Sequence, residues 1–283
     1  MNPAITPRTL LLTALAMIAF AGNSLLCRLA LKHTAIDPAT FTAVRLLSGA
    51  AVLWLLVRLR APGPAGRGNW PSAAALFLYA AGFSLAYVNL PAATGALILF
   101  GAVQATMIGV GIARGERLGG RSLLGLLLAL GGLVGLLLPG LSAPPFGAAA
   151  LMLGAGIAWG VYSLRGQGAG DPTRVTAGNF VRAAPIGIVA WLLWPGTRPL
   201  DPAGVGYAIA SGAVASGLGY SIWYSVVPTL KSTRAAVVQL CVPALATLGG
   251  FALLGEPITL RIVLASVAIL GGIALVIGSA QRR

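Results

Sequence analysis

Ten continuous apolar runs, each about long enough to cross a lipid bilayer, follow one another along this sequence of 283 residues. A bilayer core about 30 Å thick needs roughly 20 apolar residues in a helix that rises about 1.5 Å per residue. Because the runs are continuous and do not alternate between apolar and polar residues, they predict helices and not the strands of a barrel. We place them at 10–31, 38–57, 71–90, 92–112, 122–138, 146–164, 172–194, 203–227, 232–254 and 258–279.

The composition supports an all-α membrane protein. Apolar residues make up 58% of the chain and charged residues 8%, with a mean hydropathy of +0.91, so there is too little polar surface for a water-soluble globule. The net charge of +14 does not predict a nucleic-acid partner, because the cations lie between the apolar runs and form no single basic face. The expected partners are the lipid bilayer and a small-molecule substrate.

The N-terminus imitates a signal peptide, with MNPAITPR, an apolar segment and a small-residue AFA motif. Ile18-Ala19-Phe20 reappears, however, as Ile157-Ala158-Trp159 in the second half of the chain. Cleavage would remove one element of a repeat, so we interpret this segment as a retained first transmembrane helix.

An internal duplication is visible in the two glutamates. Glu116 in ARGERLGGR and Glu256 in LLGEPITLR stand 140 positions apart, and each precedes an arginine and then a Gly-Gly pair at the same spacing. The pairs Asp37-Pro38 with Asp171-Pro172 and Pro91 with Pro228 extend the match. We therefore predict two repeats of five helices, 1–140 and 141–283.

An odd number of helices per repeat makes the second repeat enter the membrane from the opposite side, as in many secondary transporters. Ten helices also place both termini on one side. Of the 19 Lys and Arg residues, thirteen would lie on the side of the termini, three on the other side and three within spans. This bias predicts inverted repeats with both termini in the cytoplasm.

These motifs resemble the drug/metabolite transporter superfamily, as two tandem EamA-type repeats. The resemblance rests on the Gly-Glu turns in GERLGGRSLLG and GEPITLRIVLA, the prolines of NLPAAT and VVPTLK, and the arginines of AVRLLSG and FVRAAP. Val103 departs from it, since a proline like Pro243 is expected there. The resemblance implies a ten-helix carrier of the bacterial cytoplasmic (inner) membrane that exports small metabolites by alternating access.

Within that superfamily the chain looks most like the branch that exports aromatic amino acids. The alternatives are a broad drug or metabolite exporter, a threonine or homoserine exporter and, more remotely, a channel. We expect a monomer, because one chain already contains both inverted units. An enzyme is not expected, since a single histidine and no buried acid leave no catalytic cluster.

Aromatic and polar residues inside the spans are the candidate substrate contacts. Phe20, Tyr79 and Trp159 lie about halfway along their helices, deeper than the interfacial belt where Trp and Tyr usually collect. The predicted substrate-binding residues are Phe20, Asn23, Tyr79, Phe83, Phe100, Trp159, Tyr162 and Tyr220. A second group comprises Tyr87, Gln104, Arg45, Arg182 and Gln239.

Each candidate in the second group has a structural alternative. Tyr87 could belong to the interfacial belt, and the amides could join helices by hydrogen bonds. For Arg45 and Arg182, we favour snorkelling to the interface or binding of carbonyls of a neighbouring helix over recognition of a substrate carboxylate.

The acidic residues bear on energy coupling. All five, at positions 37, 116, 171, 201 and 256, fall at predicted helix ends, so we expect no buried carboxylate for proton antiport. No GxxxxGK[ST] loop for a nucleotide occurs, and no metal or other cofactor is expected. These features favour downhill facilitated export, or coupling through groups that the sequence does not identify.

Two glycine pairs predict close helix packing. Gly156 and Gly160 form one GxxxG step, and Gly131 and Gly135 form another.

Overall fold

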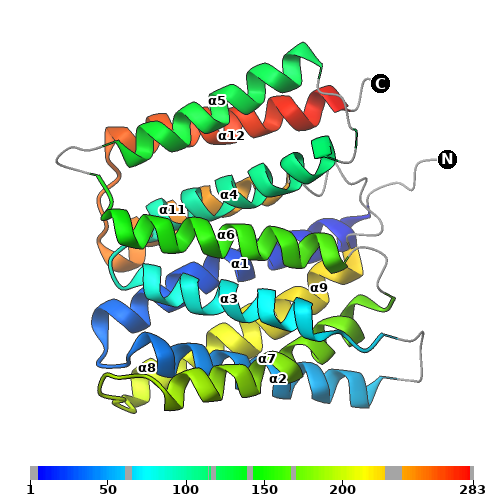
Figure 1. Cartoon of the computed structure of the whole chain (residues 1–283), viewed down its shortest axis with the longest axis vertical. Helices are drawn as coiled ribbons and strands as arrows, with labels where there is room; N and C mark the ends of the chain where they lie inside the picture. Colours follow the sequence, from blue (N-terminus) through cyan, green and yellow to red (C-terminus); the bar gives the residue numbers. More distant parts are fainter. Residues whose placement is uncertain are drawn as a thin grey trace.

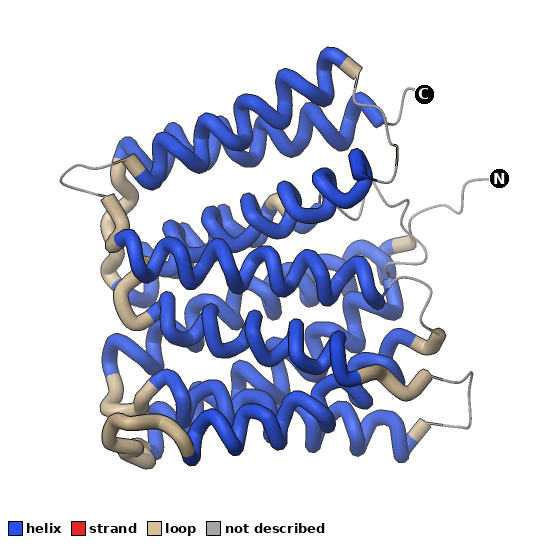
Figure 2. Tube along the Cα trace, viewed as in Figure 1, coloured by secondary structure: helices blue, strands red, loops and turns tan. Residues whose placement is uncertain are grey.

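The computed structural model describes residues 6–60, 66–113, 115, 119–138, 143–166, 170–226 and 238–280. Every regular element within these residues is a helix (Figure 2). The helices are α1 (Pro7–His33), α2 (Pro38–Leu59), α3 (Trp70–Tyr87), α4 (Ala92–Ala113), α5 (Gly120–Leu137), α6 (Phe146–Gly166), α7 (Pro172–Leu192), α8 (Pro202–Ile209), η1 (Ala210–Leu218), α9 (Gly219–Val226), α11 (Cys241–Leu254) and α12 (Leu260–Ala280).

Seven helices in the described residues are long and apolar enough to cross a membrane, counting Pro202–Trp223 as one. The shorter apolar helices Cys241–Leu254 and Leu260–Leu275 lie beside them. Large aliphatic side chains such as Leu128 and Leu264 face outward, as lipid contact requires. The predicted all-α, multi-pass membrane fold is confirmed at this level.

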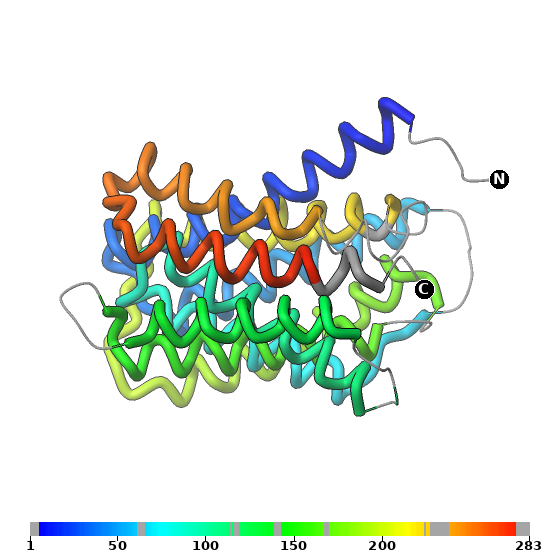
Figure 3. Tube along the Cα trace, turned by 90° about the horizontal axis from the view of Figure 1, so that it is seen from above, coloured from blue at the N-terminus to red at the C-terminus, as the bar shows by residue number. Residues whose placement is uncertain are grey.

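The helices lie side by side, and successive crossings run in opposite directions (Figure 1). The start of α1 and the end of α12 lie at the same end of the bundle (Figure 1), called here the termini-bearing end. The opposite end is called the far end. The pair α5 and α12 forms one edge, and α2, α7 and α8 form the other (Figure 1). Viewed from above, the first turns of α1 lean away from the bundle (Figure 3).

Three helices begin at the Asp-Pro pairs of the sequence. Asp37, Asp171 and Asp201 are the N-caps of α2, α7 and α8, and each side chain accepts hydrogen bonds from backbone N–H groups of the first turn. The following proline fits the first helical position, where no N–H is needed. The placement of these three acids at helix ends is confirmed, whereas Glu116 lies outside the described residues, as does the predicted repeat boundary at 140 and 141.

The eighth crossing is not one regular helix. A π-helix, η1, separates α8 from α9 within the run predicted at 203–227. The segment ASGAVASGL is made of small residues, which lets its backbone approach α2 closely. A Cβ atom on Gly212 would lie 2.1 Å from the carbonyl oxygen of Arg45.

The glycine predictions met different outcomes. A Cβ atom on Gly156 would lie 2.6 Å from Ala102 Cβ, and one on Gly160 2.9 Å from Thr106 Cβ, so close packing of α6 on α4 is confirmed. The prediction for Gly131 and Gly135 is wrong, because a Cβ atom at either position meets nothing within 4 Å. The neighbouring Gly132 makes the close contact instead.

Candidate substrate site

A small cavity in the middle of the bundle gathers most of the predicted substrate-binding residues. They come from α1, α3, α4, α6 and α9, and therefore from both halves of the chain. Its walls are formed by Phe20, Asn23, Ser24, Tyr79, Phe83, Leu99, Phe100, Trp159, Ala215, Tyr220 and Gln239. Of the first predicted group, only Tyr162 is missing from these walls.

Trp159 is the hub of the aromatic cluster. Its ring centroid lies 4.7 Å from that of Tyr79, 5.1 Å from that of Tyr220 and 5.3 Å from that of Tyr162, on which it stacks. Phe20 meets Tyr220 edge-on at 5.7 Å. Such pairs add about 0.5–1.5 kcal/mol each beyond the burial of their area. Tyr162 thus supports the site from behind Trp159.

The cavity is contracted in this structure. The volume open to the centre of a water molecule is about 20 Å³, which holds roughly one water and no amino acid. An amino acid could enter this cavity only if side chains on its walls moved aside. A far larger groove of about 670 Å³ lies between α5 and α12, but its walls are mostly leucine and glycine and face outward. Its composition suits lipid tails better than a polar metabolite.

A chain of hydrogen-bonded polar side chains begins at Asn23 and Tyr79 on the cavity wall and continues behind it. Ser211 donates to Asn23 Oδ1 at 2.6 Å, and Asn23 Nδ2 donates to the Tyr79 hydroxyl at 3.2 Å. Arg45 Nη2 donates to the same hydroxyl at 3.1 Å and to Ser216 Oγ at 3.4 Å. Both serines belong to the π-helix η1, and the sequence analysis missed them. Their only signal was the small polar residues of ASGAVASGL.

The two predicted arginines behave differently. Arg45 is 1% exposed, and its guanidinium carbon lies 5.1 Å from the ring centroids of both Tyr79 and Phe83. The preferred interpretation of Arg45, snorkelling or carbonyl binding, is therefore wrong. Arg182 does bind carbonyls, but not those of a neighbouring helix. Its Nη1 donates to the carbonyl oxygens of Arg67, in the segment before α3, at 2.6 Å and of Gly178, in its own helix α7, at 2.8 Å.

Two remaining candidates lie away from the cavity. Tyr87 is buried, packs edge-on against Phe83 with ring centroids 4.7 Å apart, and donates its hydroxyl to the Ala92 carbonyl. This position is that of a packing residue and not of an interfacial anchor. Gln104 lines a separate small cavity with residues such as Leu126 and Ile273.

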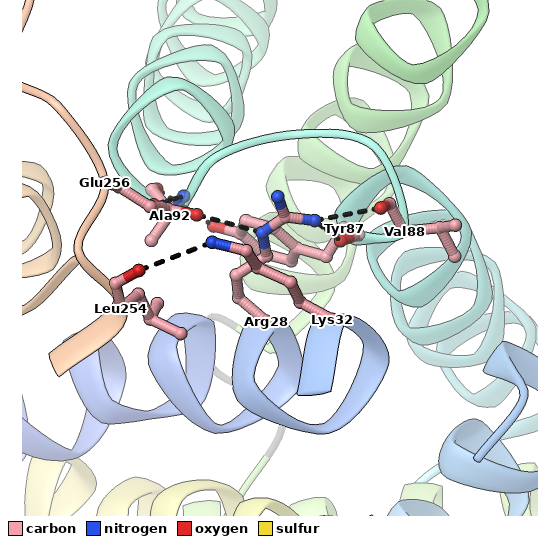
Figure 4. A network of polar contacts seen from close by, with 7 residues as sticks. All are labelled: Arg28, Lys32, Tyr87, Val88, Ala92, Leu254 and Glu256. Atoms are coloured by element: carbon pink, nitrogen blue, oxygen red, sulfur yellow. Dashed lines mark hydrogen bonds and ion pairs between the residues drawn. The ribbon is translucent and has the colours of Figure 1, made fainter. Parts of the chain in front are cut away.

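Near the far end, a buried ion pair joins Arg28 and Glu256 (Figure 4). Arg28 Nε donates to Glu256 Oε1 at 2.9 Å, and Arg28 Nη1 donates to the carbonyls of Tyr87 and Val88, each at 2.9 Å. Glu256 Oε2 accepts the Ala92 N–H at 2.7 Å. The network ties α1 to the connection between α3 and α4 and to the connection between α11 and α12.

This network contains a buried acid. Glu256 follows the last residues of α11, so its place at a helix end is confirmed, but it is only 6% exposed and is paired. The chain thus holds a buried carboxylate that the sequence did not predict, whereas the absence of a carboxylate for proton antiport stays a prediction. Among the described residues, no group of three or more His, Cys, Asp or Glu side chains could hold a metal ion.

Comparisons with known proteins identify the family. Residues 146–278 match the model of the EamA-like transporter family. The uncharacterized protein PA1977 of Pseudomonas aeruginosa is 60% identical over 271 residues, which cover 95% of this chain and 94% of that protein. The chain belongs to the EamA-like transporter family. This EamA-type chain is thus a membrane transporter of the drug/metabolite superfamily and not an enzyme, as predicted.

Two further comparisons bear on the family. The threonine/homoserine exporter RhtA of Salmonella typhimurium is 36% identical to this EamA-type chain over 130 residues, 43% of this chain and 42% of RhtA. A protein of known crystal structure, 21% identical, aligns with a TM-score of 0.66 over 97% of this chain and 98% of its own. That likeness concerns the fold alone.

Proposed function

We propose that the protein is a secondary transporter that exports aromatic amino acids or similar amphipathic metabolites by alternating access. One observation supports this most: Phe20, Tyr79, Trp159 and Tyr220 converge from four helices on a single central cavity. Aromatic faces attract both a substrate ring and an ammonium group. Asn23 and Gln239 supply hydrogen-bonding groups on the same walls.

The helix contacts support two five-helix repeats, 1–140 and 141–283, related by a pseudo-two-fold axis. The contact of α3 with α6 has its counterpart in the contacts of α8, η1 and α9 with α1. Likewise, the contact of α4 with α6 corresponds to that of α11 with α1. The contact of α2 with η1 corresponds to that of α7 with α3. Three further pairs, α2 with α7, α4 with α11 and α5 with α12, join each helix to its own counterpart. Exchanging the halves leaves this pattern unchanged.

The two arginines that follow the Gly-Glu motifs support opposite orientations of the two repeats in the membrane. Arg121 is the second residue of α5, and α5 begins at the termini-bearing end (Figure 1). Arg261 Nη1 donates at 2.7 Å to the carbonyl of Leu138, the C-cap residue at the other end of α5. Because the sequence predicts most of the cations at the termini-bearing end, we propose that this end faces the cytoplasm of a bacterium and that the membrane is the inner membrane.

We propose facilitated export by a monomer. Each chain would hold both inverted units, and Glu256 is paired with Arg28 away from the cavity walls. Uphill accumulation of substrate in proteoliposomes acidified on one side would contradict the absence of proton coupling. A dimer that loses transport on dissociation would contradict the monomer.

A threonine or homoserine exporter is the second candidate, because the similarity to RhtA covers part of the chain. The polar wall residues Asn23, Ser24 and Gln239 would suit a small hydroxylated side chain.

Counterflow in proteoliposomes tests both candidates. Labelled phenylalanine would be competed by unlabelled phenylalanine, tryptophan, threonine or a cationic drug, and saturation would separate a carrier from a channel. We expect the aromatic amino acids to compete best, and Trp159→Ala and Tyr79→Ala to change the order of competitors. If both variants keep the wild-type order, the cavity is not the substrate site. If threonine competes best, the second candidate is favoured.

A further inference from the structure

The guanidinium of Arg45 is incompletely bonded. Nε and Nη2 contact the hydroxyls of Ser216 and Tyr79, whereas Nη1 has no hydrogen-bond partner in the described part of the chain. Buried polar atoms nearly always have a partner, and a guanidinium offers five N–H donors in a fixed fork. An unused donor at 1% exposure is therefore a structural exception.

The charge of Arg45 is uncompensated as well. Within the described ranges its side chain contacts neutral hydroxyls and the faces of two aromatic rings, and no carboxylate. Arg28, by comparison, is paired with Glu256. A buried cation without an anion is costly in protein and more so in a membrane, so an anionic ligand that reaches it gains much more than it would from an already paired arginine.

Arg45 lies directly behind the cavity wall. Tyr79 and Phe83 line the cavity on one side and contact the guanidinium on the other. The Tyr79 hydroxyl accepts from Arg45 Nη2 and from Asn23 Nδ2. If the Tyr79 ring moves aside, as entry into so small a cavity requires, both donors become free for one ligand group.

We infer that Arg45 binds the carboxylate of the transported compound, which replaces the Tyr79 hydroxyl and accepts hydrogen bonds from Nη1 and Nη2 of Arg45 and from Asn23. Arginine suits this role because its fork matches the two oxygens of a carboxylate. The inference rests on the proposed function and narrows it: the substrate class is defined by a carboxylate, which aromatic amino acids share with threonine and homoserine.

Competition by analogues that lack the carboxylate or the amine tests the inference on the wild-type protein. Proteoliposomes would be loaded with labelled phenylalanine and challenged with phenylalanine, phenylalaninamide, which lacks the carboxylate, and 3-phenylpropionate, which lacks the amine. We expect the amide to compete about 10- to 100-fold more weakly than phenylalanine, as loss of hydrogen bonds to a charged group implies. If phenylalaninamide competes as well as phenylalanine, the inference is overturned. Labelled threonine with threoninamide repeats the test for the other side-chain class.

Substitutions of arginine test whether the preference for a carboxylate comes from Arg45. Arg45→Gln should reduce the preference for phenylalanine over its amide to near unity, while Arg182→Gln, at the matching position of the other repeat, should leave the preference unchanged. If Arg45→Gln does not fold, Arg45→Lys retains the charge but loses the fork and should lower the preference partly. A folded Arg45 variant with the full wild-type preference would refute the assignment.

The two failures are distinguishable. If no amino acid shows saturable counterflow, the proposed function is wrong. If amino acids are transported but their amides or phenethylamine compete as well, the function stands and the role of Arg45 is wrong.

Discussion

The Nε atom of Arg28 lies 2.9 Å from Oε1 of Glu256, a residue 228 positions further along the chain. The two side chains are 11% and 7% exposed. The pair joins the first helix of the chain to the turn before the last helix, near the far end of the bundle (Figure 4). It is therefore a contact between the two proposed repeats, in a position where separation of the repeats would open the far end.

Removal of either partner should destabilise the protein. Glu256→Gln leaves Arg28 buried without its anion, and such a change costs about 3–5 kcal/mol. Arg28→Gln should cost a similar amount, and the double variant should cost clearly less than the sum. Thermal unfolding in detergent measures this, with Arg261→Gln as a control for a half-buried arginine that binds a carbonyl. Additive effects of the two changes would show that the pair is not coupled.

The opposite placement of Arg121 and Arg261 predicts a topology. Single cysteines at these positions, in a background with Cys27→Ala and Cys241→Ala, should react with a membrane-impermeant thiol reagent from opposite sides. The position corresponding to Arg121 should be reached from the cytoplasm and that corresponding to Arg261 from outside. Arg117, whose labelling would serve equally, lies outside the described residues. Labelling of both positions from one side would rule out inverted repeats.

Gly212 should tolerate no side chain. A Cβ atom there would lie 2.1 Å from both the Arg45 carbonyl oxygen and Ser48 Oγ, so Gly212→Ala must push η1 away from α2. Overpacking of this kind typically costs about 1–3 kcal/mol. The matched control is Gly206→Ala in α8, where a Cβ atom meets nothing within 4 Å and alanine should be neutral or stabilising by about 0.5–1 kcal/mol. Equal melting temperatures for the two variants would contradict the close packing.

The hydrogen bonds of Asp201 predict that the stability of the fold depends on pH. Hydrogen bonds from the Gly204 N–H, and then from Ala35 and Ala203, hold the pKa of this carboxyl below its ordinary value of 3.8. A lowered folded-state pKa contributes stability that is present above 3.8 and is lost as the pH falls through the folded-state pKa. Asp201→Asn should therefore melt at a lower temperature than wild type at neutral pH. The difference should vanish in strong acid, and its persistence there would contradict this origin.

Much of this architecture could be predicted from local sequence. Apolar runs bounded by Pro and Gly fix helix ends closely: the run predicted at 92–112 is observed as Ala92–Ala113. Depth along each helix also placed Phe20, Tyr79 and Trp159 at one level, and they do line one cavity. Helix ends and depth in the bilayer depend on the length and apolar pattern of one segment at a time. Both can therefore be read from local sequence.

The predictions that failed depend on distant segments. The burial of Arg45 is decided by Tyr79, Phe83 and Ser216, which come from two other elements, and that of Glu256 by Arg28 and Ala92. Nothing in ASGAVASGL marks a π-helix, because small residues are compatible with either helical pattern. The error at Gly131 is smaller, since the contacting glycine is the next residue, about 100° around the helix.

The π-helix has one more consequence. It holds Ser211 and Ser216 against α1 and α2, and it is followed directly by Tyr220 and Trp223 on α9. If one turn of η1 rewound to the tighter α pattern, the residues after it would shift in register by one position and rotate by about 100°. Tyr220 would then leave the cavity while α8 stayed anchored at Asp201. Such local rewinding would exchange one cavity wall for another, and we expect amide hydrogen exchange within Ala210–Leu218 to slow when substrate is bound.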